Sequence, residues 1–157
     1  MDALASARWC KQQRREIRVG ETSQQLCQEY LQSAQETLQV LEQIGKTSNM
    51  WLATTKYYCE YFAFTAVLMK LGIRSEIHEC TIALCSMLES EGIIRAGTST
   101  TLEEDKELRI DNQYYLKNKD VAADHDDLLD FVLEMKRVCE TLTSEQTTSV
   151  RNLVSHL

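Results

Sequence analysis

The chain has 157 residues, which is enough to bury a sizeable hydrophobic core and fits one domain over residues 1–157. Hydrophobic and charged residues make up 43% and 26%, as is ordinary for a globular protein, and the net charge of −7 disfavours a protein that coats nucleic acid through its overall field. No apolar run approaches the ~18–20 residues that span a bilayer, so no membrane partner is expected. The absence of proline and the presence of only five glycines favour helices joined by short turns.

The N-terminal segment is basic and is predicted to form a helix from about Ala3 to Arg18, which ends near Gly20. Its charges follow small residues without an apolar centre, unlike a secretory signal, so we expect a cytoplasmic location. This helix either docks onto an acidic surface of its own bundle or of a partner, or it provides a face for RNA.

A second helix is predicted to begin near Thr22 or Ser23. Apolar residues recur there at every third or fourth position, which is typical of a helix with one buried face. Gly45 is placed to cap its C-terminus.

The third predicted helix, Ser48 to Leu71, is the most apolar segment of the chain. It carries two neighbouring apolar lines and only a narrow charged strip with Lys56, Glu60 and Lys70. We therefore expect it to be the central helix, buried by its own bundle and by a second subunit. Its aromatic residues are assigned to the core or to a dimer interface: Tyr57, Tyr58, Tyr61 and Phe62.

Gly72 is predicted to end this helix, and Ser75 to cap the next one, whose apolar stripe stops before Gly92. After a loop, Thr100 or Thr101 is expected to start another helix through a capping box with Glu103 or Glu104.

A last long helix is predicted from about Asp120 to Leu142, followed by a short, frayed helix from Ser144. Together these segments predict an all-α fold, an antiparallel up-and-down bundle of five to six helices.

Six cysteines occur without a Cys-x-x-Cys pair and without a matching pair of histidines, so the sequence favours free, buried thiols over disulfides or a metal site. No metal and no cofactor are expected. The cysteines are Cys10, Cys27, Cys59, Cys80, Cys85 and Cys139.

The segment KYYCEYFAFTAVLMKLGIRSEIHECTI resembles the signature of the HEPN family (higher eukaryotes and prokaryotes nucleotide-binding domains). Tyr57 and Tyr58, then Gly72-Ile73 and then His78 match a branch with a paired-tyrosine helix, and the resemblance covers about residues 22–142. It implies a helical bundle that forms a homodimer. It also implies a nucleotidyltransferase partner in a module of the toxin–antitoxin type.

Many members of that family are metal-independent ribonucleases. Their motif is an arginine, four to six further residues and a histidine, and both subunits contribute it to a cleft at the interface. The motif falls on ELRIDNQYYLKN, where Arg109 takes the arginine position, but Tyr114, Tyr115 and Leu116 take the positions of the histidine. The nearest branch often reads Arg-x-x-x-Asp-Tyr, which Arg109 to Tyr114 fits with Gln113 in place of the acid.

Arg109 can bind a phosphate through two parallel hydrogen bonds, whereas tyrosine, with a pKa near ~10, is a poor general base at neutral pH. The stretch therefore predicts that RNA or a nucleotide phosphate binds to Arg109, Asn112, Gln113 and Tyr114. A regular helix does not place Arg109 and Tyr114 on one face, so either the helix is distorted or the other subunit completes the site. A plain salt bridge between Arg109 and Asp105 is the structural alternative.

Two other functions stay open from the sequence. In the first, the protein is an active ribonuclease that uses His78 or His125 as its base. His78 is otherwise a residue at the start of a helix, and His125 lies among carboxylates beside an apolar stripe. In the second, the protein is a non-enzymatic interaction scaffold.

Overall fold

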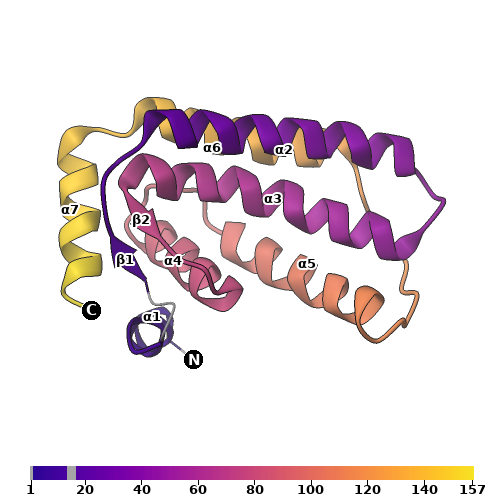
Figure 1. The fold of residues 1–157 in the computed structure, drawn as a ribbon, viewed down its shortest axis with the longest axis horizontal. Coiled ribbons are helices and arrows are strands. Elements are labelled where there is room, and N and C mark those ends of the chain that lie inside the picture. The colour runs from indigo at the N-terminus through magenta and orange to yellow at the C-terminus, as the bar shows by residue number, and fades with distance from the viewer. Residues whose placement is uncertain (1, 14–16) are drawn as a thin grey trace.

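The computed structural model describes residues 2–13 and 17–157 of the chain. Four helices run along the long axis in alternating directions, and three shorter ones gather at one end (Figure 1). The four long helices are α2 (Gln24–Ile44), α3 (Asn49–Leu71), α5 (Thr98–Gln113) and α6 (His125–Thr141). The three shorter ones are α1 (Ala3–Lys11), α4 (His78–Ser90) and α7 (Ser144–Ser155).

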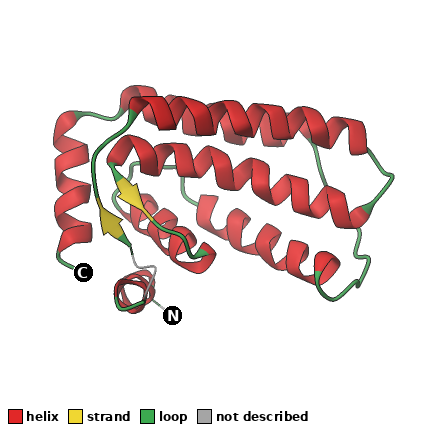
Figure 2. Cartoon of the chain, viewed as in Figure 1, coloured by secondary structure: helices red, strands yellow, loops and turns green. Residues whose placement is uncertain are grey.

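These seven helices of the described residues confirm the all-α prediction, with one helix more than the upper expectation. The only strands in this part of the chain are β1 (Arg18–Val19) and β2 (Ile73–Arg74), which pair antiparallel and were not predicted (Figure 2). None of the described helices combines the length and the low polarity that crossing a bilayer requires.

Helix α3 lies at the centre of the bundle, where α2, α5 and α6 all pack on it (Figure 1). Tyr57, Phe64 and Leu68 are buried on its faces, as the two apolar lines predict. Within the charged strip of this helix, Glu60 is only 1% exposed and Lys56 is half-buried. The side chains of Lys56 and Glu60 face neighbouring helices because α2, α5 and α6 pack around α3.

The serine starts of the two longest helices are confirmed. The side chains of Ser23 and Ser48 accept hydrogen bonds from backbone N–H groups in the first turns of α2 and α3. Gly45 and Gly72 end these helices as predicted.

Two predicted caps are wrong. Helix α4 begins at His78 with Ile77 as its N-cap, and Ser75 does not bond to its first turn. Helix α5 begins at Thr98 after Gly97, without a capping box. Its start is stabilised instead by Glu89 of α4, whose carboxylate accepts hydrogen bonds from the backbone N–H and the hydroxyl of Ser99.

The predicted N-terminal helix and the predicted last long helix are both shorter than expected. Helix α1 ends at Lys11, Arg18 lies in a strand, and the prediction for residues 14–16 lies outside the described residues. Helix α6 begins at His125 because Asp124 caps it, so the predicted start at Asp120 falls in the connection.

The C-terminal tail forms a helix, but it is anchored rather than frayed. Thr143 and Gln146 form a capping box at the start of α7, and Val150 and Val154 are buried against the bundle. The guanidinium of Arg151 donates hydrogen bonds to the backbone carbonyl of Leu71 at the end of α3 and to that of Gly20, directly after β1.

The free-thiol prediction is wrong for two cysteines. Cys10 of α1 and Cys80 of α4 form a disulfide across 70 residues of chain. The basic N-terminal helix therefore docks onto its own bundle, and an ion pair of 2.8 Å between Arg18 and Glu76 joins the following strand to the segment before α4. The free-thiol prediction is confirmed for the other four cysteines, which are buried: Cys27, Cys59, Cys85 and Cys139.

Candidate functional site

Arg109 lies in the last turns of α5 with its guanidinium among three tyrosine rings. The guanidinium carbon is 5.0 Å from the ring centre of Tyr57, 5.5 Å from that of Tyr58 and 5.8 Å from that of Tyr114. These distances are typical of cation–π contacts, and only 6% of the arginine is exposed. Helix α3 and the C-terminal end of α5 thus surround one buried positive charge.

Tyr114 contacts Arg109 from the C-terminal end of the same helix. Helix α5 stops at Gln113, and Tyr114 is its C-cap with 65% of its surface exposed. Leu116 adopts a positive φ of 50°, so the chain leaves the helical path directly after the tyrosine pair. The stretch ELRIDNQYYLKN is therefore half helix and half connection. The long side chains of Arg109 and Tyr114 nevertheless come within 5.8 Å of each other at this end of the helix.

The charge of Arg109 has no carboxylate partner within the described part of the chain. Asp105, the alternative partner, pairs instead with Lys56 at 2.9 Å, so the predicted salt bridge to Asp105 is wrong. One guanidinium nitrogen donates to the side-chain oxygen of Gln113 at 3.3 Å. The buried Nε has no hydrogen-bond partner. A buried cation with an unused donor is unfavourable alone, and an anion would satisfy both needs.

His78, the first residue of α4, belongs to the same group of side chains. Its Nδ1 lies 2.8 Å from the hydroxyl oxygen of Tyr57, and its ring centre lies 4.6 Å from that of Tyr61. Burial and the positive charge of Arg109 lower the pKa of His78 from its ordinary value, so the imidazole is neutral at neutral pH. We call the six residues the tyrosine–arginine cluster: Tyr57, Tyr58, Tyr61, His78, Arg109 and Tyr114.

The hydroxyls of Tyr57 and Tyr61 stay protonated at neutral pH. Burial and the neighbouring Tyr61 raise the pKa of Tyr57, and burial raises the pKa of Tyr61. A neutral phenol is a hydrogen-bond donor, so these side chains provide donors and ring faces but no base at neutral pH.

Of the other predicted site residues, Asn112 is buried and its amide is already engaged. It exchanges two hydrogen bonds with the backbone of Lys119, at 2.9 and 2.8 Å, and also donates to the carbonyl of Asn49. Asn112 therefore holds the connection between α5 and α6 against the start of α3, while Gln113 contacts Arg109 directly.

His125 lies at the first turn of α6, where its Nε2 is 2.7 Å from a carboxylate oxygen of Glu42. None of its bonds within the described residues reaches the tyrosine–arginine cluster. Phe62 does lie beside the cluster, with its ring centre 5.6 Å from that of Tyr58. The structure thus brings His78, but not His125, to Arg109.

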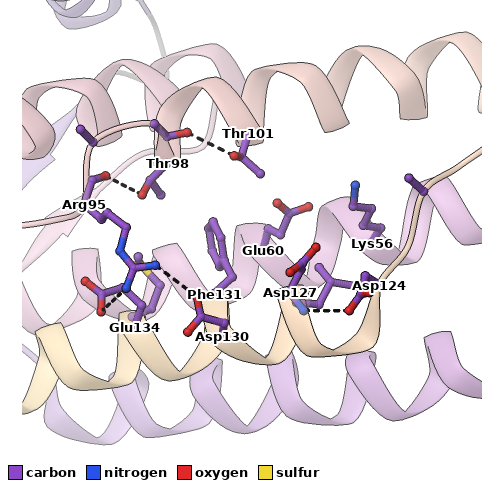
Figure 3. A pocket seen from close by; sticks show the side chains of 15 residues that line it. Lys56, Glu60, Arg95, Thr98, Thr101, Asp124, Asp127, Asp130, Phe131 and Glu134 are labelled. Carbon is purple, nitrogen blue, oxygen red and sulfur yellow. Dashed lines mark hydrogen bonds and ion pairs between the residues drawn. The ribbon is translucent and has the colours of Figure 1, made fainter.

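A second feature escaped the sequence analysis. A cavity of ≈ 470 Å³ lies between α3, α5 and α6, and Glu60 lines it (Figure 3). The signal that could have found it is a carboxylate in the most apolar helix of the chain, at a position that α3 must bury. No group of three or more His, Cys, Asp or Glu among the described residues is arranged to hold a metal ion.

Comparisons of the chain with protein-family models, with curated proteins and with solved structures found no match.

Proposed function

We propose that the protein binds the phosphate of RNA or of a nucleotide at the tyrosine–arginine cluster. The observation that carries this proposal is the guanidinium of Arg109, which is buried, lacks a carboxylate partner among the described residues and keeps an unpartnered Nε. A phosphate oxygen would accept from that nitrogen and neutralise the charge.

The rings around Arg109 suit the rest of such a ligand. Tyr114 is exposed and can stack on a base, and stacking on aromatic side chains is the common mode of binding single-stranded RNA. In this proposal nuclease activity is absent or weak, because tyrosine occupies the place of the histidine that moves the proton.

The proposal includes a homodimer that completes the cleft. It is supported by exposed apolar residues beside the cluster: Trp51 and Val40 are 53% and 52% exposed and line a groove with Tyr58 and Phe62. The proposal also includes a nucleotidyltransferase-type partner in a module of the toxin–antitoxin type, which rests on the resemblance to the HEPN family. Sedimentation equilibrium tests the dimer, and a monomer at all concentrations would remove the shared cleft.

The binding test uses a fluorescently labelled single-stranded RNA, with ATP in a second series to distinguish RNA from a free nucleotide. Arg109→Met keeps the length of the side chain and removes its charge, so we expect affinity to fall about tenfold or more. Arg8→Met removes an exposed charge from the basic helix α1 and should change affinity less than about twofold. Absence of salt-sensitive binding to both ligands would refute the proposal, and an equal loss in both variants would move the RNA site to α1.

A second candidate function is a metal-independent ribonuclease with His78 as its base. It is favoured by the neutral imidazole beside Arg109, since a base must be unprotonated at the working pH. When Nδ1–H donates to the hydroxyl oxygen of Tyr57, Nε2 is the unprotonated nitrogen that can accept a proton from a substrate hydroxyl. Cleavage of single-stranded RNA in EDTA that His78→Gln abolishes and His125→Gln preserves would establish this activity.

The third candidate, an interaction scaffold, is favoured if the protein dimerises and binds neither RNA nor ATP. A cytoplasmic location is left out of the proposal, because disulfides such as Cys10–Cys80 persist mainly in oxidising compartments.

A further inference from the structure

The cavity between α3, α5 and α6 is large enough for a small organic molecule. Its volume of ≈ 470 Å³ lies within the ~300–1,000 Å³ of typical ligand pockets. Glu60 and Lys56 of α3 project into it, Thr98 and Thr101 of α5 border one side, and α6 with Phe131 borders the other (Figure 3).

The central polar group of this cavity is the carboxyl of Glu60. The residue is only 1% exposed, and its Oε1 is buried without a hydrogen-bond partner. It hydrogen-bonds on its other side with Asp105, which is held by Lys56 at 2.9 Å. Burial and the adjacent Asp105 hold the pKa of Glu60 well above its usual range, which favours the neutral carboxylic acid.

The charges around Glu60 leave the cavity negative. Lys56 is engaged by Asp105, and Arg95 in the loop before α5 is engaged by Asp130 and Glu134 of α6. Both cations that line the cavity are therefore already neutralised.

Two further carboxylates line the cavity at the start of α6, those of the N-cap residue Asp124 and of Asp127. Asp124 accepts the hydrogen bonds that cap the helix, while Asp127 is exposed and forms no ion pair within the described residues. The cavity therefore offers acceptors and negative charge to a ligand, and no unpaired cation.

The remaining wall is apolar. Leu128, Phe131 and Met135 of α6 contribute it, and the ring of Phe131 can also face a cation. We propose that this cavity binds a primary ammonium carried on a small apolar group, with the carboxylate of Glu60 accepting from the ammonium and the apolar group against α6.

Binding in this site is coupled to the loss of one proton. The ammonium arrives charged and supplies the partner that Oε1 lacks, so it stabilises the ionised form of Glu60. The carboxyl proton leaves to the solvent, and the ammonium donates to the carboxylate in its place. The groups that face Glu60 are Lys56 and Asp105, which form an ion pair with each other, and Asp124 and Asp127 at the start of α6. Arg95, before α5, is paired with Asp130 and Glu134 of α6.

The test is calorimetric titration of the full chain with phenethylammonium at pH 6 to 7, with 2-phenylethanol as the neutral ligand of the same shape. We expect the amine to bind about tenfold or more tightly than the alcohol and to release protons on binding, measured with an indicator dye in weakly buffered solution. Equal affinity for the two ligands, no binding of the amine, or binding without proton release would each overturn the proposal.

Variants separate the cavity from a general attraction to an acidic protein. Glu60→Gln keeps the shape and should lower affinity for the amine about tenfold or more and abolish proton release. Asp127→Asn, an exposed change, should weaken binding with the fold intact and the proton release retained. Glu104→Gln, the same substitution at an exposed position outside the cavity, should bind like the natural chain; equal effects of Glu60→Gln and Glu104→Gln would also overturn the proposal. Arg109 plays no part here, so this site and the tyrosine–arginine cluster are tested independently.

Discussion

Two residues of this bundle place ionisable side chains in buried surroundings that normally exclude charge. Arg109 and Glu60 are both buried, one among tyrosine rings and one beside a second carboxyl. Burial of an ionisable group is unfavourable unless a partner or a proton offsets it. Titration can therefore measure the effect of Arg109 on a neighbouring pKa and the effect of Glu60 on the pH dependence of stability.

The electrostatic influence of Arg109 is expected to show at His78. We predict that NMR titration of the histidine ring gives a pKa below the ordinary 6.5, because burial and the arginine charge both disfavour the imidazolium. Arg109→Met should raise this pKa towards the ordinary value, while the remaining burial keeps it lowered. The resonance is assigned by its loss in His78→Gln, and an unchanged pKa in Arg109→Met would contradict the arrangement.

The same shift predicts how stability depends on pH. Because the folded pKa of His78 lies below the unfolded one, its contribution is fully present above pH 6.5 and is lost as pH falls towards the folded pKa. Urea unfolding from pH 8 to pH 5 should show that the natural chain loses stability relative to His78→Gln over this window. A constant difference would contradict the shift.

Glu60 predicts the opposite slope. Its pKa is raised in the fold, so the natural chain is most favoured below the unfolded value of 4.5 and loses stability as pH rises through the folded value. Gln cannot ionise, so the stability of Glu60→Gln relative to the natural chain should increase from pH 4.5 upward. Denaturant unfolding at successive pH values measures the difference, and a flat difference would mean that Glu60 is ionised in the fold.

At the scale of elements, the antiparallel pair of strands β1 and β2 holds one end of the bundle together. Gly72 ends α3 with a φ of 73°, and its carbonyl accepts a hydrogen bond of 2.7 Å from Gly20. Arg151 of α7 donates to the carbonyls of Gly20 and Leu71 at 2.7 and 2.9 Å. The segment after β1 and helix α7 thus both contact the chain at Gly72, where α3 ends.

Gly72→Ala should destabilise the fold strongly. A Cβ there would lie 2.8 Å from the carbonyl oxygen of Gly20 and 2.9 Å from the amide nitrogen of Thr22, and a left-handed alanine costs about 1–2 kcal/mol before any clash. We expect a total loss of more than about 2 kcal/mol in the free energy of unfolding.

Gly92→Ala is the matched control, since Gly92 also has a positive φ of 69° but no atom within 4 Å of the added Cβ. It should show the backbone cost alone, about 1–2 kcal/mol. Equal losses in both variants, measured by denaturant unfolding, would show that the close approach at Gly72 has no energetic effect.

At the scale of the whole molecule, the disulfide joins the N-terminal helix to the rest. Helix α1 has nine residues, fewer than an isolated helix needs to be stable in water, and it packs mainly on α4 (Figure 1). The covalent link through Cys10 and Cys80 holds it there.

Reduction of this bond is expected to release α1 while α3 stays folded. Loss of a cross-link of this loop length typically costs about 2–4 kcal/mol. Hydrogen exchange followed by mass spectrometry, with and without dithiothreitol, should show faster exchange confined mainly to α1. The double variant Cys10→Ser/Cys80→Ser should exchange quickly there in both conditions; protection of α1 that is independent of the bond would contradict this account.

Much of the fold follows from local sequence. Ser23 and Ser48 begin the longest helices and Gly45 and Gly72 end them, because caps and glycine conformations depend on neighbouring residues alone. The two apolar lines of α3 identified the central helix for the same reason. Predicted starts failed where a distant residue decides, as at Ser99, which is bonded by Glu89 of another helix.

The sequence by itself thus determined the all-α class and the central helix, and it identified Arg109 as a candidate site residue. Only the tertiary structure decided what surrounds these residues. Cys10 and Cys80 are brought together across 70 residues, and His78 is joined to Arg109 through the ring of Tyr57, which contacts both. Spacing along a chain specifies which face of a helix a residue occupies. The packing of helices distant in sequence then selects the partner, or leaves none, as for the oxygen of Glu60.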